Sequence, residues 1–237
     1  MNSTKKQARV AGLLYLLASI IGFFCLAYVP GKLIVSGDAT ATANRIRTSE
    51  TLLRFGIVSE LIAFTMFIFV VLALYRLFKA VSEKHAVAMA TLLLISIPIS
   101  LLNVLNEIAA LVLVSGGGFL SAFEKGQVDA LAYLFLRLHG QGFIVAQIFW
   151  GLWLFPFGIL VIRSGFIPRF LGVLLFVAGS GYLASSFTSL LLPQYARLVD
   201  QFAMALTAGE LPIIFWLLIW GAKVPPLDQP PHDPAIV

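Results

Sequence analysis

Six long apolar runs limit the fold of this chain more than any other feature. The hydrocarbon core of a bilayer is about 30 Å thick and needs about 20 apolar residues per crossing helix. Charged residues, glycine or proline bound each run. The runs cover approximately residues 10–29, 53–75, 86–114, 140–162, 170–192 and 202–221. The sequence therefore predicts an all-α, polytopic integral membrane protein whose six transmembrane helices form one bundle.

Composition supports this fold class and excludes several functions. The chain is 60% hydrophobic and 11% charged, whereas a soluble domain has about 25% charged residues. The excess of basic residues lies in short clusters beside the apolar runs, which is how orientation is encoded and not how a nucleic-acid groove is built. The lipid bilayer is thus a predicted partner and nucleic acid is not. Cys25 is the single cysteine, which excludes an intrachain disulfide and a CxxC redox pair.

The distribution of basic residues predicts the orientation. One side carries Lys5, Lys6, Arg9, Arg76, Lys79, Lys84, Arg163, Arg169 and Lys223, and the other carries Lys32, Arg45, Arg47, Arg54, Lys125, Arg137 and Arg197. The larger set lies close to the helix ends, which favours the cytoplasmic side for both termini. We expect a multi-pass protein of the plasma membrane.

Some segments depart from simple spans. Residues 1–223 are predicted to form the transmembrane domain, and the Pro-rich residues 224–237 a disordered tail. Residues 127–138 have mixed polarity, so they either continue the fourth helix beyond the bilayer or lie along its surface, with a hinge at Gly140 and Gly142. The third run is longer than a span requires and predicts tilt or a bend at Pro98.

Three acidic residues interrupt the apolar runs. A charge inside a bilayer costs at least a few kcal/mol, so such residues are functional candidates. Glu60, Glu107 and Glu210 lie roughly 9–12 Å from the outer ends of their runs, at 1.5 Å per helical residue. We expect these three acids to share one level in the outer half of the bilayer.

Other polar residues fall in the same layer. Ser96, Ser100, Asn103 and Glu107 have the spacing of one helical stripe, which must face protein or water. His139 is predicted at or just above the membrane rim. The remaining polar residues are Asn106 on the third helix, Gln147 on the fourth, and Ser185, Ser186, Thr188 and Ser189 on the fifth. Together they outline a polar cavity that opens to the outer side above an apolar cytoplasmic floor.

Each candidate residue also has a structural interpretation, in which it binds no ligand. Asn103, Asn106 and Gln147 either orient a ligand or join helices by hydrogen bonds. A buried Glu can be a protonated carboxyl bonded to a neighbouring helix, and His139 can be an interfacial hydrogen-bonding group. The glycine pairs Gly151 with Gly158 and Gly172 with Gly179 predict close helix packing.

Three kinds of chemistry fit such a site. Glu60, Glu107, His139 and Glu210 could coordinate a divalent metal, although no HExxH or ExxH spacing is present. Neighbouring carboxylates could instead support proton-coupled movement, or bind a cationic or hydroxylated head group.

Several segments resemble a known family. They are RVAGLLYLLASIIG from Arg9 to Gly22, the link RSGFIPRFLG from Arg163 to Gly172 within a longer match from Leu138 to Leu183, and GELPIIFWLLIWG from Gly209 to Gly221. This pattern resembles the bacterial family described as domain of unknown function 4386. The resemblance implies a six-span protein of the bacterial inner membrane and adds no chemistry. His139 and Glu210 lie within the matching segments, and Glu60 and Glu107 lie outside them.

Our first hypothesis is a membrane protein that binds or moves a small polar or cationic ligand, with or without a coupled proton. In it Glu60, Glu107 and Glu210 supply negative charge, and His139 guards the entrance. Asn103, Asn106 and Gln147 orient the ligand. The alternatives are an intramembrane enzyme whose metal is held by the same carboxylates and His139, and a structural subunit whose buried acids join helices. The sequence indicates no particular cofactor.

Overall fold

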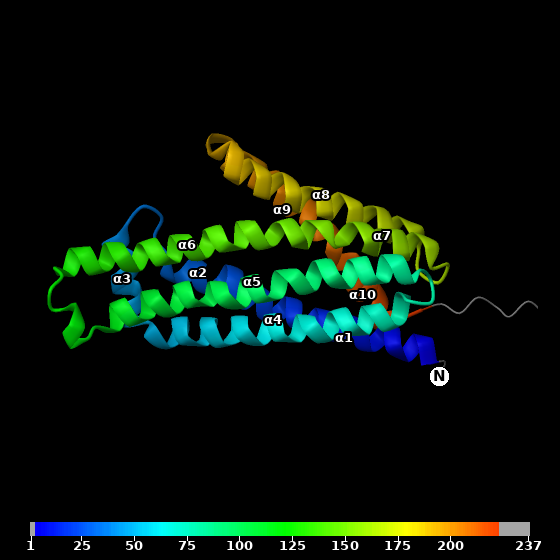
Figure 1. The fold of residues 1–237 in the computed structure, drawn as a ribbon, viewed down its shortest axis with the longest axis horizontal. Helices are drawn as coiled ribbons and strands as arrows, with labels where there is room; N and C mark the ends of the chain where they lie inside the picture. Colours follow the sequence, from blue (N-terminus) through cyan, green and yellow to red (C-terminus); the bar gives the residue numbers. More distant parts are fainter. Residues whose placement is uncertain (1–2, 223–237) are drawn as a thin grey trace, which may run out of the picture.

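All six predicted spans are helical in the computed structural model, which describes residues 3–222 (Figure 1). The segments long and apolar enough to cross a membrane are Thr4–Leu33, Glu50–Phe78, Glu83–Ser115, Lys125–Arg163, Arg169–Leu191 and Pro193–Ile219. No strand occurs within residues 3–222. The prediction of an all-α, six-span protein is confirmed. The predicted tail, residues 224–237, lies outside the described residues.

Several spans are divided into shorter helices. The first contains α1 (Ser3–Phe23), the π-helix η1 (Phe24–Tyr28) and α2 (Val29–Leu33). The second is α4 (Glu50–Phe78), the third α5 (Glu83–Ser115), the fourth α6 (Lys125–Leu152) with α7 (Leu154–Arg163), and the fifth α8 (Arg169–Leu191). The sixth contains η3 (Pro193–Tyr195), α9 (Ala196–Thr207), η4 (Ala208–Glu210) and α10 (Leu211–Ile219). Connections carry α3 (Ala39–Thr48) and η2 (Gly118–Leu120).

The spans pack in chain order. Contacts join α1 to α4, α4 to α5, α5 to α6, α7 to α8 and α8 to α9, and α10 returns to α1. In Figure 1, α1, α4, α5 and α6 follow the long axis, whereas α8 and α9 slope away from α6. Both ends of the described chain lie at one end of the bundle, opposite α3. That this end is cytoplasmic stays a prediction from the basic residues.

Prolines account for three interruptions of the spans. A proline lacks the N–H that would bond the carbonyl four residues earlier, so the helix is weakened there. In each of the three cases, the residue four positions before the proline lies where the regular α-helix is interrupted. The pairs are Pro30 with Leu26 in η1, Pro156 with Leu152 at the end of α6, and Pro212 with Ala208 in η4.

Neither of two predicted irregularities breaks its helix, and the tilt or bend at Pro98 stays a prediction. α5 continues through Pro98, because a long helix packed against α4 and α6 can absorb one missing hydrogen bond. α6 continues through Gly140 and Gly142, so the predicted hinge is wrong. Of the two alternatives for residues 127–138, the structure has the one in which they continue the fourth helix, since α6 begins at Lys125 and not near 140. The sixth span likewise begins earlier than predicted, at Pro193 and not near 202.

Buried apolar side chains form two clusters along the bundle. The α3 cluster includes Ile46, Leu53, Ile57, Val104 and Leu136. The terminal cluster, nearer the chain ends, includes Tyr15, Val70, Leu93, Trp153 and Leu217. On each of α4, α5 and α6 a stretch of helix separates the two clusters. Buried polar residues occupy these stretches, as the next section describes.

Glycines bring α8 into backbone contact with the fourth span. A Cβ atom on Gly151 would lie 2.8 Å from the carbonyl oxygen of Gly179, and one on Gly158 would lie 2.8 Å from that of Gly172. Such distances are too short for any larger residue. The predicted packing role of these four glycines is confirmed.

The short helix α3 covers one end of the bundle. The Asp38 side chain caps it by accepting from the N–H of Ala41 at 2.8 Å. Arg47 of α3 forms an ion pair with the buried Asp129 of α6. The N–H of Gly37 donates to the Tyr133 hydroxyl at 2.8 Å, a second link to α6. α3 is therefore held in place by polar contacts, of which the ion pair of Arg47 with Asp129 is partly buried.

Candidate functional site

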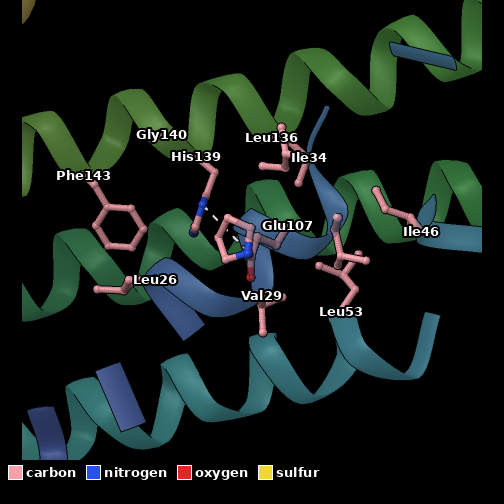
Figure 2. Close-up of a pocket in the computed structure, with 12 residues that line it drawn as sticks. Leu26, Val29, Ile34, Ile46, Leu53, Glu107, Leu136, His139, Gly140 and Phe143 are labelled. Atoms are coloured by element: carbon pink, nitrogen blue, oxygen red, sulfur yellow. Dashed lines mark ion pairs between the residues drawn. The ribbon is translucent and has the colours of Figure 1, made fainter. Parts of the chain in front are cut away.

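Three neighbouring spans bring Glu60, Glu107 and His139 together, one residue each from α4, α5 and α6. One ligand atom from each of the three side chains lies within 4.8 Å of the other two. His139 Nε2 is 3.2 Å from Glu60 Oε2, and Nδ1 is 3.9 Å from Glu107 Oε1. Each ring nitrogen thus faces a different carboxylate, and Figure 2 shows His139 and Glu107 directed toward each other. We call these three residues the triad.

The triad lies inside the protein. The exposed fractions are 0% for Glu60, 3% for Glu107 and 6% for His139. Glu60 Oε1 is 3.3 Å from His139 Nε2 in hydrogen-bonding geometry, whereas Glu107 Oε2 has no hydrogen-bond partner among the described residues. Within residues 3–222, the two acids form ion pairs only with His139. Two buried carboxylates therefore share one imidazole and still have unsatisfied acceptor capacity.

His139 lies well within α6 and is buried inside the protein. Its place at the membrane rim stays a prediction of the sequence. α6 begins at Lys125, so His139 is about 21 Å along the helix at 1.5 Å per residue. The apolar run begins only at Gly140, and this shifted the predicted helix start toward His139. The structure places His139 between the two acids, and its role at an entrance stays a prediction.

Asn103 connects the triad to the backbone of α6. Its Nδ2 donates to the carbonyl oxygen of His139 at 2.8 Å, and its Oδ1 accepts from Asn106 Nδ2 at 3.0 Å. The close approach depends on Gly142, where an added Cβ would lie 2.1 Å from Asn103 Oδ1. The two asparagines therefore fix α5 against α6 beside His139.

The predicted polar stripe on α5 faces the protein interior. Ser96, Ser100, Asn103 and Glu107 are all buried. Ser96 Oγ donates to the Leu93 carbonyl within the same helix, at 2.7 Å. The Ser100 hydroxyl has no hydrogen-bond partner among the described residues. The stripe thus begins at Ser96, between the two apolar clusters, and ends at Glu107 in the triad.

A cavity of about 150 Å³ lies beside the triad. Its polar side chains are Glu107 and His139. The rest of the wall consists of Leu26, Val29, Pro30, Leu33, Ile34, Ile46, Leu53, Leu136, Gly140 and Phe143 (Figure 2). The sequence had predicted a cavity lined by polar residues, whereas this one is apolar with two polar groups at one side. The first span supplies much of the wall, through residues in and just after η1.

Aromatic rings close the site toward the terminal cluster. The Phe143 ring meets His139 edge to face, with centroids 4.7 Å apart. Phe143 also contacts Phe64 and Trp150, with centroids 6.0 Å and 5.7 Å away. The sequence had predicted an apolar cytoplasmic floor. These three rings make this side of the site apolar, and that the side is cytoplasmic stays a prediction.

Glu210 and Gln147 lie outside the triad. The Tyr182 hydroxyl donates to Glu210 Oε2 at 3.4 Å, between α8 and η4. Ser186 Oγ donates to Gln147 Oε1 at 3.5 Å, between α8 and α6. Two side chains at equal depth on separate helices meet only if each helix is rotated so that its side chain points toward the other. The structure thus brings two of the three predicted acids together, and gives Gln147 the contact of a helix-joining residue.

Sequence reasoning missed the apolar wall and the ion pair of Arg47 with Asp129. The residues of the wall are of the same types as residues that face lipid, so no sequence signal marks them. Asp129 carries a weak signal, because Lys125 and Asp129 have the i, i+4 spacing of a helical ion pair, and the structure places these groups 3.4 Å apart.

Comparison with known proteins gives a family match. The family model described as domain of unknown function (DUF4386) matches residues 10–221. An uncharacterized protein of Archaeoglobus fulgidus is 35% identical over 80 residues, which is 34% of this chain and 46% of that protein. The match thus spans about half the length of that curated relative. No solved structure matches the chain.

Proposed function

We propose that this chain, which belongs to the family described as domain of unknown function (DUF4386), binds a divalent metal cation such as Zn²⁺ at the triad. The observation that carries the proposal is the meeting of two buried carboxylates and one imidazole from three separate spans. The sequence analysis gave such a metal as an alternative to a small polar or cationic ligand, with Glu60, Glu107, His139 and Glu210 as its candidate ligands.

Charge balance supports a cation at this position. An isolated buried carboxylate is strongly destabilised unless a cation or a proton neutralises it. Within the described chain, neither Glu60 nor Glu107 forms an ion pair with a lysine or arginine. A divalent cation with two carboxylates and a neutral imidazole makes the site neutral overall.

The donor set supports a metal in particular. Zn²⁺ binds histidine nitrogen and carboxylate oxygen at about 2.0–2.2 Å, and three protein ligands leave a fourth position open. One donor atom from each side chain lies within 4.8 Å of the other two. Donors around a tetrahedral zinc ion lie about 3.4 Å apart, so small side-chain rotations would bring the three donors around one ion. Asn103 would steady the His139 backbone, as outer partners of metal ligands commonly do.

The wider setting is also proposed. We place the protein in the plasma membrane with both termini in the cytoplasm, which puts the triad in the outer half of the bilayer. Movement of a small polar or cationic ligand, with or without a coupled proton, stays a prediction of the sequence, as does an intramembrane metal-dependent enzyme. The proposed site is common to these functions.

Metal content of the purified full-length protein tests the proposal. Protein equilibrated with ZnSO₄ and then desalted should retain about one zinc per chain by mass spectrometry, as expected for one three-ligand site. Glu60→Gln and Glu107→Gln should each lose most of it, because an amide is a much poorer zinc ligand than a carboxylate. Glu210→Gln is the matched control, the same change at an acid outside the triad, and it should retain the metal.

Two outcomes would overturn the proposal. One is wild-type protein that retains neither zinc, cobalt nor manganese, in which case the buried acids have a structural role. The other is equal retention by wild type and both triad variants, which would place the metal elsewhere. Thermal unfolding with and without ZnSO₄ gives an independent reading, since an ion bound only by folded protein raises the melting temperature.

A further inference from the structure

The wall of the cavity beside the triad restricts what can reach a bound ion. Of the twelve side chains that line it, Glu107 and His139 are the polar ones, and the others are aliphatic, aromatic, proline or glycine. Glu60 does not line the cavity. An ion at the triad would therefore face the cavity between Glu107 and His139, with hydrocarbon on the remaining sides.

A strongly polar guest does not suit such a wall. Each polar group that enters an apolar site without a hydrogen-bond partner loses its hydration without compensation. A guest that fits has one atom able to ligate the ion and an apolar body for the rest. An engineered cavity of about 150 Å³ lined by Leu, Ile and Phe takes up benzene. This cavity has a similar volume of about 150 Å³, although it is partly open and has two polar groups in its wall.

We propose that the cavity binds a small amphiphile, an alkyl or aryl group of about six carbons with one metal-binding head, and that the head completes the coordination of the ion at the triad. This inference rests on the proposed function, because the head needs an ion to bind. It adds the chemical class of the second ligand, which metal binding alone does not define.

The first span is irregular beside the cavity, which is consistent with a functional site there. Leu26 lines the cavity and lies in the π-helix η1, and Pro30 lines it one turn later. Single π-helical turns inside α-helices are frequent at functional sites. Here the π-helical turn, for which Pro30 accounts, interrupts the helix at the level of the cavity.

Cobalt-loaded full-length protein in detergent provides the test. Hydroxamates chelate Co²⁺ and change its visible spectrum, so the spectrum reports contact between head and ion directly. Acetohydroxamate carries the same head as hexanohydroxamate but four fewer methylenes. Hexanohydroxamate should bind at least tenfold more tightly, since each buried methylene strengthens binding about fourfold at full burial.

Cavity-filling variants distinguish binding of the alkyl chain in the cavity from its uptake by the detergent micelle. Gly140 lines the cavity, and a Cβ added there has no atom within 4 Å. Gly140→Leu should keep its cobalt and lose the preference for the longer chain. Gly22→Leu is the matched control, because Gly22 is equally unobstructed and does not line the cavity. Ile34→Phe narrows the cavity on the side of the first span. It is the replacement variant if Gly140→Leu does not fold.

The outcomes are distinct. Absence of cobalt from wild type overturns the proposed function and this inference with it. Cobalt that is bound but unaffected by either hydroxamate, or equal affinity for both, overturns this inference and leaves metal binding intact. A chain-length preference that persists in Gly140→Leu and Ile34→Phe also overturns it, because the preference would then come from the detergent.

Discussion

Replacing Gly142 with alanine should disrupt the support of the triad, although the change adds a single methyl group. That methyl would lie 2.1 Å from Asn103 Oδ1, 2.4 Å from its Cγ and 2.7 Å from its Nδ2. All three distances are far below van der Waals contact. The Asn103 amide must therefore move, and its 2.8 Å hydrogen bond to the His139 carbonyl must lengthen or break.

The size of the effect follows from three contributions. A buried polar group left without its partner costs about 1–3 kcal/mol. Overpacking a well-packed interior costs about 1–3 kcal/mol. Alanine gains about 1 kcal/mol over glycine in a helix. The expected net loss is about 3 kcal/mol, with the intrinsic preference for alanine outweighed by the clash and the lost hydrogen bond.

Thermal unfolding in detergent measures this loss, and Gly140→Ala is its control. Gly140 is on the same helix, and a Cβ there meets no atom within 4 Å. Gly140→Ala should be neutral or slightly stabilising. In a double-mutant cycle, Asn103→Ala should remove the clash, so that the double variant is no less stable than Asn103→Ala alone. Unchanged stability of Gly142→Ala, or additive losses in the cycle, would refute the reasoning.

Three further predictions follow from contacts elsewhere. Arg47→Ala should destabilise the protein by about 1–3 kcal/mol and increase proteolysis at α3, because Asp129 would stay buried with one weaker partner; unchanged cleavage would contradict this. Gly179→Ala should cost about 1–3 kcal/mol in thermal unfolding, since its Cβ would meet the Gly151 carbonyl oxygen at 2.8 Å, and unchanged stability would argue against backbone contact. Tyr15→Phe should leave the melting temperature unchanged or raise it, because the Tyr15 hydroxyl is buried without a hydrogen-bond partner among the described residues, and a clear decrease would reveal one.

Much of the fold was predictable because bilayer thickness fixes helix length. Hydropathy located six spans, and the spacing of the polar residues on α5 predicted a buried stripe. The ends of the fourth and sixth spans were predicted less well, because polar residues such as Asp129 depress the local hydropathy. Asp129 is nonetheless buried, since Arg47 from a distant segment pairs with it.

The candidate site was predictable in part, and geometry explains the rest. Depth along a helix can be counted from the sequence, and it placed Glu60, Glu107 and Glu210 at one level. Which residues meet at that level depends on the rotation of each helix and on its neighbours. Glu60 and Glu107 lie on adjacent spans and meet at His139, whereas Glu210 lies on a turn beside α8 and contacts Tyr182. The sequence does not give the rotation of each helix about its axis, so it cannot show which of the three acids meet.

The two sides of the cavity differ in stiffness. On one side α6 is pinned to α5 where Asn103 holds the His139 carbonyl and fills the space above Gly142. On the other, the first span changes from α to π winding and then reaches Pro30, which cannot donate a hydrogen bond. A bulkier guest would therefore push Leu26 and Pro30 outward before it disturbed His139. The wall formed by the first span would adapt to guests of different size, and the wall formed by α6 would keep the ion-binding geometry constant.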